Sequence, residues 1–214
     1  MPAEVWKGGQ GALSSRALDT MSARLTHTDE QGRVHMVDVG AKPETSREAV
    51  AVAEVRMSRA TLKLVFAGPT LTRSVRGAAR KTPSTTPALS KGDVLATARV
   101  AAIAALKKTA DWIPLCHPVR VVGTDVQIEP LPALPGLRIQ VTVRAFDRTG
   151  VEMEAMVGAS AAALTVYDMV KGVERGVEIR TIRLEKKTGG RSGVWTRSEG
   201  ARASLSKTKA RPGR

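Results

Sequence analysis

Four stretches of the chain alternate apolar and polar residues with the two-residue period of a β-strand. They are Glu48–Met57, which alternates around valines, Val119–Glu129, Leu137–Phe146 and the segment 177–187. Side chains on a strand point alternately to its two faces, so this pattern predicts strands that bury one face. The linker PLPALPG joins the second and third stretches. A turn rich in proline and glycine between two strands indicates a β-hairpin.

Three other stretches are helical in character. A short helix is predicted over 58–66, and a longer, alanine-rich one over 91–111, where Asp93 stands in position to cap the first turn. The longest helix is predicted from about Val151 to Glu174. The resulting order, β-α-β-β-α-β, predicts an α+β fold. It is the order of a ferredoxin-like sandwich, an antiparallel sheet with both helices on one face.

Length and composition limit the kind of protein that this is. The chain has 214 residues, 42% of them hydrophobic, which is enough to bury the core of one domain. A single cysteine excludes an internal disulfide and argues against a cysteine-rich zinc site. No apolar run approaches the roughly 18 residues that span a bilayer, and the first residues lack the apolar stretch of a secretory signal. We therefore expect a soluble, cytoplasmic protein with no membrane partner.

The formal charge of +14 is typical of a nucleic-acid binder, but its distribution argues otherwise. Residues 67–90 and 186–214 together hold twelve of the fourteen net positive charges. Both segments are rich in small and polar residues, a composition that cannot offset the entropy of ordering. We expect a flexible N-terminal extension (1–24), one domain (25–193) with a disordered basic insertion (67–90), and a disordered basic tail (194–214).

The hexapeptide IPLCHP, residues 113–118, places the one cysteine of the chain beside one of its three histidines. Pro114 and Pro118 each fix their own φ and restrict the preceding residue, so this corner is stiff. A rigid His117 suits ligand binding or proton transfer, although a histidine in a loop is also a common turn residue. Cys116 is either a small buried residue or a nucleophile. No thiolate-stabilising neighbour adjoins it in the sequence.

The longest predicted helix carries a second candidate group of residues. Glu154 and Asp168 are fourteen residues apart, which places them on the same helical face, and Asp168 and Lys171 are close enough to touch. Glu152 is expected to point elsewhere. The Asp168 and Lys171 pair is either an exposed ion pair or a pair in which each group shifts the pKa of the other, as acid/base catalysis requires.

Five sequence blocks, in this order, resemble the signature blocks of the cyclic pyranopterin monophosphate synthase family, also called the MoaC family. The blocks are LTHTDEQGRVHMVDVGAKPETSREA, KGDVLATARVAAIAALKKTADWIPLCHP, TGVEMEAM, AALTVYDMVKGV and KTGGRSG. The resemblance implies a lyase of molybdenum cofactor biosynthesis that converts cyclised dihydro-GTP into cyclic pyranopterin monophosphate and releases diphosphate. It also implies a ferredoxin-like homohexamer, a trimer of dimers, with active sites at subunit interfaces.

The same resemblance implies the residues of the active site. Asp168 would be the catalytic residue, with Lys171 acting beside it. The substrate-binding residues that it implies are Leu115, Cys116, His117, Met153, Glu154, Lys42, Lys91 and Lys187. Arg47, nearby in the sequence, is expected to bind substrate as well, and with it these lysines would hold the triphosphate and neutralise the departing diphosphate. No metal site and no organic cofactor are implied, and whether a divalent ion accompanies the triphosphate stays open.

Two features depart from the family pattern. Arg191 stands in GGRSG where a lysine is expected, which keeps the charge but changes its geometry. The predicted insertion at 67–90 is longer than the loop usual in the family.

The alternative function is a ferredoxin-like RNA-binding module with basic tails. We expect no nucleic-acid partner, because such modules stack bases on sheet aromatics and the two hairpin strands offer only Phe146.

Overall fold

The computed structural model describes residues 27, 31–67, 92–131 and 134–198. The chain divides into two units, Met1–Val37 and Asp38–Arg214. In the first unit, the His35 amide donates to the His27 carbonyl at 3.0 Å. Every described helix and strand belongs to the second unit. The predicted extension 1–24, almost all of the insertion 67–90 and the tail from residue 199 lie outside the described residues.

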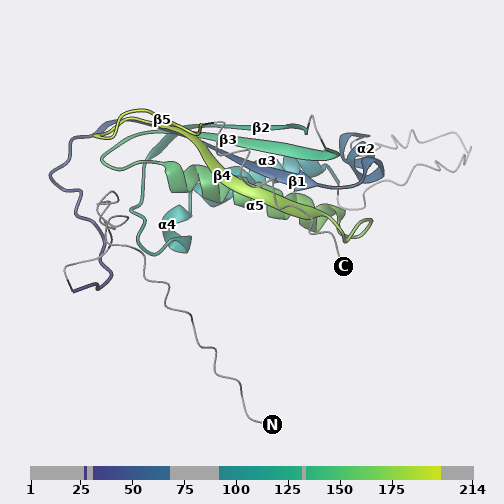
Figure 1. The fold of residues 1–214 in the computed structure, drawn as a ribbon, viewed down its shortest axis with the longest axis horizontal. Helices are drawn as coiled ribbons and strands as arrows, with labels where there is room; N and C mark the ends of the chain where they lie inside the picture. Colours follow the sequence, from purple (N-terminus) through teal and green to yellow (C-terminus); the bar gives the residue numbers. More distant parts are fainter. Residues whose placement is uncertain (1–26, 28–30, 68–91, 132–133, 199–214) are drawn as a thin grey trace, which may run out of the picture. The chain divides into compact units, whose positions relative to one another are not determined.

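The second unit contains a five-stranded sheet in which all neighbouring strands are antiparallel (Figure 1). In spatial order the strands are β2 (Val121–Pro130), β3 (Gly136–Asp147), β1 (Thr45–Arg56), β4 (Glu178–Thr188) and β5 (Trp195–Thr196). The four predicted strands are all present, and β2 and β3 form the predicted hairpin. The short β5 lies at the start of the segment that we expected to be a tail, and it pairs with Lys186 and Lys187.

Two long helices pack on one face of this sheet, which confirms the predicted α+β arrangement. In Figure 1, α5 (Glu152–Val170) runs along β1, β3 and β4, and α3 (Val94–Leu106) lies beside it and reaches β2. Two shorter helices, α2 (Arg59–Ala67) and α4 (Thr109–Trp112), complete the unit. No helix in the part of the chain that the structure describes has the length and apolar character needed to cross a membrane.

The ends of the helices follow from local hydrogen bonds. Asp93 caps α3 as predicted, because its Oδ1 accepts from the Ala96 amide at 2.9 Å. The predicted helix over 91–111 is wrong in one respect, since it is broken after Leu106. There the buried Thr109 hydroxyl donates to the Leu106 carbonyl at 2.9 Å, and the chain turns before α4 begins. Similarly, α5 ends at Val170, four residues before the predicted end.

The core lies between the sheet and the two long helices. Alternate residues of β1 and β3 point into it: Ala49, Ala51, Ala53, Val55, Leu137, Ile139, Val141, Val143 and Ala145. Small residues on the helices allow a close approach. A Cβ added at Gly158 of α5 would lie 3.2 Å from Val141 Cγ1 and 3.5 Å from the Ala102 carbonyl oxygen. The alanine-rich sequence therefore serves tight packing of α5 against α3 and β3.

The opposite face of the sheet carries a network of charged side chains over the buried Val52. Arg183 contacts Glu54 at 2.9 Å and Glu185 at 2.7 Å, and Arg138 approaches both carboxylates at 3.9 Å. The four charged side chains are each less than a third exposed. The charged side chains on this face are thus paired with one another and only partly exposed to solvent, whereas the face under the helices is apolar.

Candidate active site

The IPLCHP corner packs against the first turn of α5. Glu154 is only 2% exposed, and the Cys116 thiol donates to Glu154 Oε1 with the sulfur 3.8 Å away. The same sulfur lies 3.7 Å from the carbonyl oxygen of His117. Among the described residues, the other carboxylate oxygen of Glu154, Oε2, is buried without a hydrogen-bond partner. The fold therefore brings together a cysteine and a glutamate that are 38 residues apart in the chain.

The surroundings of this pair keep the thiol protonated. Burial raises the pKa of Cys116 from 9.0 to about 11, and the nearby Glu154 carboxylate adds to the rise. Burial also raises the pKa of Glu154 above 4.5, an effect that the hydrogen bond from Cys116 partly offsets. The negative charges of Glu152 and Asp147 raise it further. A thiol with this pKa is a hydrogen-bond donor near neutral pH, which favours the interpretation of Cys116 as a buried residue over that of a nucleophile.

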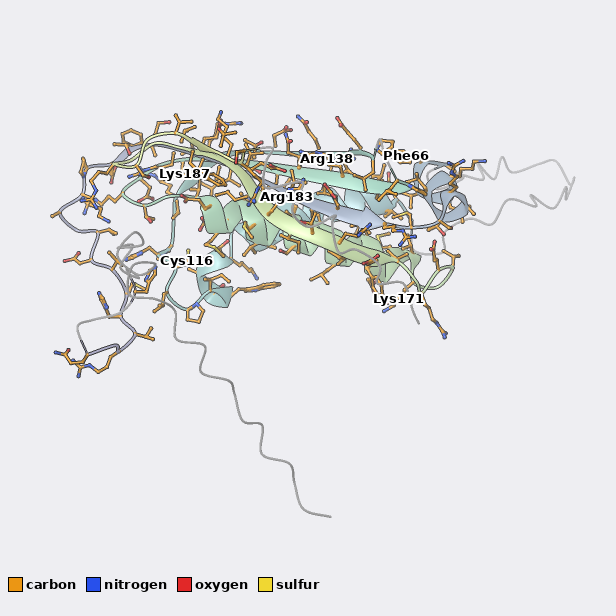
Figure 2. The ribbon with its side chains drawn as sticks, in the orientation of Figure 1. Phe66, Cys116, Arg138, Lys171, Arg183 and Lys187 are labelled. Carbon is orange, nitrogen blue, oxygen red and sulfur yellow. The ribbon has the colours of Figure 1, made fainter. Side chains whose placement is uncertain are left out.

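Lys187 lies at the same end of α5, at the end of β4. Its Nζ is 4.0 Å from Glu152 Oε1 and donates to the Ser192 hydroxyl. Glu152, which we expected to point elsewhere, thus faces the lysine. Figure 2 places Cys116 and Lys187 toward one end of α5 and Lys171 at the other.

Two arginines stand beside this group. Arg47, near the start of β1, donates from Nε to the Asp147 carbonyl at 3.2 Å and from Nη2 to the Arg148 carbonyl at 3.1 Å. Arg148 in turn donates from Nη1 to the Gly40 carbonyl at 2.7 Å. Gly40 lies in the turn that is closed by the Lys42 amide donating to the Val39 carbonyl at 3.1 Å. The turn that carries Lys42 is thereby joined to the loop before α5.

The far end of α5 carries the second group. Lys171 Nζ lies 2.6 Å from Asp168 Oδ1, and the two side chains are 51% and 54% exposed. The hydrogen bond and the negative charge of Asp168 raise the pKa of Lys171. At 1.5 Å per residue, the fourteen residues between Glu154 and Asp168 amount to about 21 Å along the helix. The predicted contact within the pair is confirmed, but the pair is far from Cys116.

The structure thus divides the predicted site residues into two groups within one chain. Asp168 and Lys171 form the second group, and Lys91 lies outside the described residues. The first group, at the N-terminal end of α5 and the loops around it, contains Leu115, Cys116, His117, Met153, Glu154, Lys187, Arg47 and Lys42. Sequence reasoning did not single out Arg148 or Ser192. Their positions directly before TGVEMEAM and within KTGGRSG were a usable signal.

Within the described ranges, no three histidine, cysteine, aspartate or glutamate side chains gather as a metal site would require. The group at the start of α5 combines a buried carboxyl with cationic side chains on adjacent loops. Such an arrangement suits an anionic ligand that also offers hydrogen-bond donors.

Comparison with known proteins identifies the family. The model of the MoaC family matches residues 36–190, well over half of the chain. This chain belongs to the MoaC family. A cyclic pyranopterin monophosphate synthase from Brucella ovis is 47% identical over 181 residues, which cover 85% of this chain and 98% of the relative. A protein of the same name from a Nostoc species is 51% identical over 172 residues, which cover 80% of this chain and 91% of the relative.

The resemblance predicted from the five blocks is therefore confirmed. As a MoaC family member, the chain keeps its similarity to these relatives across almost their whole length, so both groups of residues on α5 fall within the shared region. The family match favours the enzyme over the RNA-binding alternative.

Proposed function

We propose that this chain is a cyclic pyranopterin monophosphate synthase, which converts cyclised dihydro-GTP into cyclic pyranopterin monophosphate and diphosphate in molybdenum cofactor biosynthesis. The observation that carries the proposal is the identity of 47% and 51% to proteins of that name over at least 91% of their length. The reaction opens one ring and closes another by proton transfers at nitrogen and oxygen, so it needs no organic redox cofactor.

The pair of Asp168 and Lys171 carries out the proton transfers in this proposal. The two side chains are 2.6 Å apart and both reach solvent, so a substrate has access to either of them. The raised pKa of Lys171 means that it holds its proton firmly until a substrate weakens the contact with Asp168. A proton donor beside a carboxylate that can accept a proton is the arrangement that general acid/base catalysis requires.

The other end of α5 binds the substrate. Lys42 and Lys187 hold the triphosphate at this end. Lys91, which lies outside the described residues, joins them in neutralising the charge that develops on the leaving diphosphate. In this proposal the pterin contacts Leu115, Cys116, His117, Met153 and Glu154, and the hydrogen bond between Cys116 and Glu154 supports their grouping. Glu154 supplies a carboxyl in a poorly solvated position, where a hydrogen bond to a ligand N–H is worth more than in water.

The two groups cooperate across a subunit boundary. A single pterin cannot touch side chains that are about 21 Å apart along one helix, and a second copy of the chain can bring Asp168 and Lys171 to the first group. We infer that the chain is a ferredoxin-like subunit of a homohexamer, a trimer of dimers, with sites shared between neighbours.

One assay tests the function directly. The purified chain is incubated with the cyclised dihydro-GTP, and diphosphate and the cyclic pterin are measured over time. Equal amounts of both products support the proposal, and the absence of both with a folded protein contradicts it. Repeating the assay with EDTA, and then with added Mg²⁺, tests whether a divalent ion accompanies the triphosphate.

A further inference from the structure

Arg47 makes contacts that differ from those of a phosphate ligand. Two of its nitrogens, Nε and Nη2, already donate to the carbonyls of Asp147 and Arg148. Its Nη1 lies under the turn that follows β4, where a Cβ added at Gly190 would overlap it. The guanidinium is thus enclosed between two loops. Its planar fork fits several backbone acceptors at once, as the ammonium group of a lysine does not.

The loop before α5 is the centre of this arrangement. Asp147 accepts from the Arg148 amide at 2.7 Å and from the Arg120 amide at 3.1 Å, so its carboxylate fixes the turn between β3 and α5. From this turn Arg148 extends to the Gly40 carbonyl at 2.7 Å. A continuous chain of hydrogen bonds therefore runs from Arg47 through the 147–148 turn to the turn that carries Lys42.

The turn after β4 rests on the same residue from the other side. Gly189 and Gly190 both have positive φ, 92° and 69°. A Cβ on Gly189 would overlap the Ser46 carbonyl oxygen, and one on Gly190 would overlap Arg47. Glycine is needed at both positions for the conformation and for the close approach. The same turn carries Ser192, whose hydroxyl accepts from Lys187 Nζ, so the direction of the Lys187 side chain depends on how the turn packs against Arg47.

We propose that Arg47 and Arg148 are positioning residues that hold the turn carrying Lys42 and the turn after β4, which contacts the Lys187 ammonium group, in place for the triphosphate, and that they do not bind phosphate themselves. The inference rests on the proposed function for the identity of the ligand. Lysine side chains lose much conformational freedom when they bind, and fixing their backbones in advance reduces what remains to be lost. The charges of the lysines provide the attraction, and the arginines determine where those charges lie.

A pair of glycine variants separates positioning from direct contact, because neither variant removes a cation. Gly190→Ala forces the turn and the Arg47 guanidinium apart, by a shift of one or the other. Gly193→Ala is the matched control, since Gly193 also has positive φ, 62°, but no atom lies within 4 Å of its added Cβ. Binding of inorganic diphosphate is measured by calorimetry at fixed ionic strength. We expect the Kd to rise about tenfold in Gly190→Ala and less than about twofold in Gly193→Ala.

Arginine variants provide the second measurement. Arg47→Lys and Arg148→Lys keep the charge but lose the fork, and we expect each to raise the diphosphate Kd and the KM about tenfold with kcat nearly unchanged. The double variant should be little worse than either single one, because both residues belong to one chain of hydrogen bonds. The control is Arg56→Lys at the other end of β1, where the side chain is 56% exposed and 3.6 Å from Glu178. It should leave both constants unchanged.

Several outcomes overturn the inference. Equal effects of the two glycine variants would assign the defect to backbone strain alone. If Arg47→Lys and Arg148→Lys bind diphosphate as tightly as the wild type, the positive charge of these residues is what matters, as expected of direct phosphate ligands. If the wild type does not bind diphosphate at all, the turns are not held in place for a phosphate ligand. If Gly190→Ala does not fold by circular dichroism, the arginine variants decide. The proposed function fails separately, through absent turnover, since diphosphate binding is measured without it.

Discussion

The two ends of α5 hold their carboxylates in opposite ways. At the N-terminal end, Glu154 is buried beside a thiol, its pKa is raised, and one of its oxygens has no partner among the described residues. At the C-terminal end, Asp168 is 54% exposed and in contact with an ammonium group. The same helix therefore offers one carboxyl in a poorly solvated position and one in water. In the proposed function this difference corresponds to a division of tasks, with ligand binding at the buried carboxyl and proton transfer at the exposed one.

The largest effect is expected from the exposed end. Asp168→Asn keeps the shape of the side chain and removes the charge that can accept a proton, so kcat should fall by about a thousandfold or more. The melting temperature should change little, because the side chain is half exposed. Asp125→Asn on β2, which removes an exposed carboxylate in contact with Gln127, is the matched control and should keep full activity. Substantial turnover by Asp168→Asn would remove this residue from the mechanism.

Mixing subunits tests whether the two ends meet in one site. Asp168→Asn and His117→Ala chains, each expected to be inactive, are combined and allowed to exchange. If each site takes the two residues from different chains, random exchange leaves about one quarter of the sites with both intact. Activity should recover to about that fraction of the wild-type value. Inactive hexamers that are verified as mixed would show that both residues serve one site from the same chain.

The buried end can be examined through its thiol. Because the pKa of Cys116 is raised from 9.0 to about 11, its alkylation by iodoacetamide should keep accelerating with pH beyond 9. Near pH 8 the thiolate fraction should be about 100-fold below that of an unperturbed cysteine. Glu154→Gln should move the midpoint toward 9, and Glu152→Gln should move it less. A midpoint near 9 in the wild type would contradict the burial of the pair.

The sign of the associated stability change follows from the same shift. A thiol whose pKa is raised on folding contributes stability below pH 9, and that contribution is lost as the pH rises toward about 11. Chemical denaturation at several pH values between these limits should detect the decrease in the wild type. Cys116→Ser, which lacks this titration, should show a smaller decrease.

The smallest effect is expected just beyond the C-terminal end of α5. Both oxygens of Glu174 accept from the Ser58 amide at 3.0 Å, which holds the start of α2. Burial raises the pKa of Glu174, but hydrogen bonds from Thr61 and Ser58 lower it by more, so the net pKa is below 4.5. Glu174→Gln should reduce the free energy of unfolding by about 1 kcal/mol, a modest value because the group is near the surface.

The pH dependence provides the check on this last prediction. A carboxyl whose pKa is lowered on folding stabilises above pH 4.5 and loses that contribution as the pH falls further. The difference between wild type and Glu174→Gln should therefore shrink below pH 4.5, while activity at neutral pH is unaffected. A constant difference at all pH values would assign the effect to packing instead of charge.

Much of the fold could be predicted because its determinants are local. The alternation in β1 and β3 reports directly which residues enter the core, and Asp93 marks the start of α3. The break after Leu106 could not be predicted, since the alanine-rich pattern continues past it. The break depends on a hydrogen bond from the buried Thr109 to a helix carbonyl.

The candidate site was predictable as a set of motifs but not as a geometry. The contact between Cys116 and Glu154, and the contacts of Arg47 with residues 147 and 148, join segments that lie 38 to 101 residues apart. Glu154 and Asp168 were predicted to share one face of the helix, but Glu154 is buried and Asp168 is half exposed. A difference of about 40° around the helix is enough to place one residue inside the core stripe and the other outside it.

The charged network over Val52 has a consequence for how the sequence can drift between species. Each arginine of the network approaches both glutamates. Replacing one of the four residues therefore leaves a charged side chain that is less than a third exposed without one of its ion-pair partners. Replacing an acidic and a basic member together leaves no such charge, and it can be nearly neutral. Substitutions at positions 54, 138, 183 and 185 should therefore covary among homologous sequences, with an acidic and a basic residue replaced together.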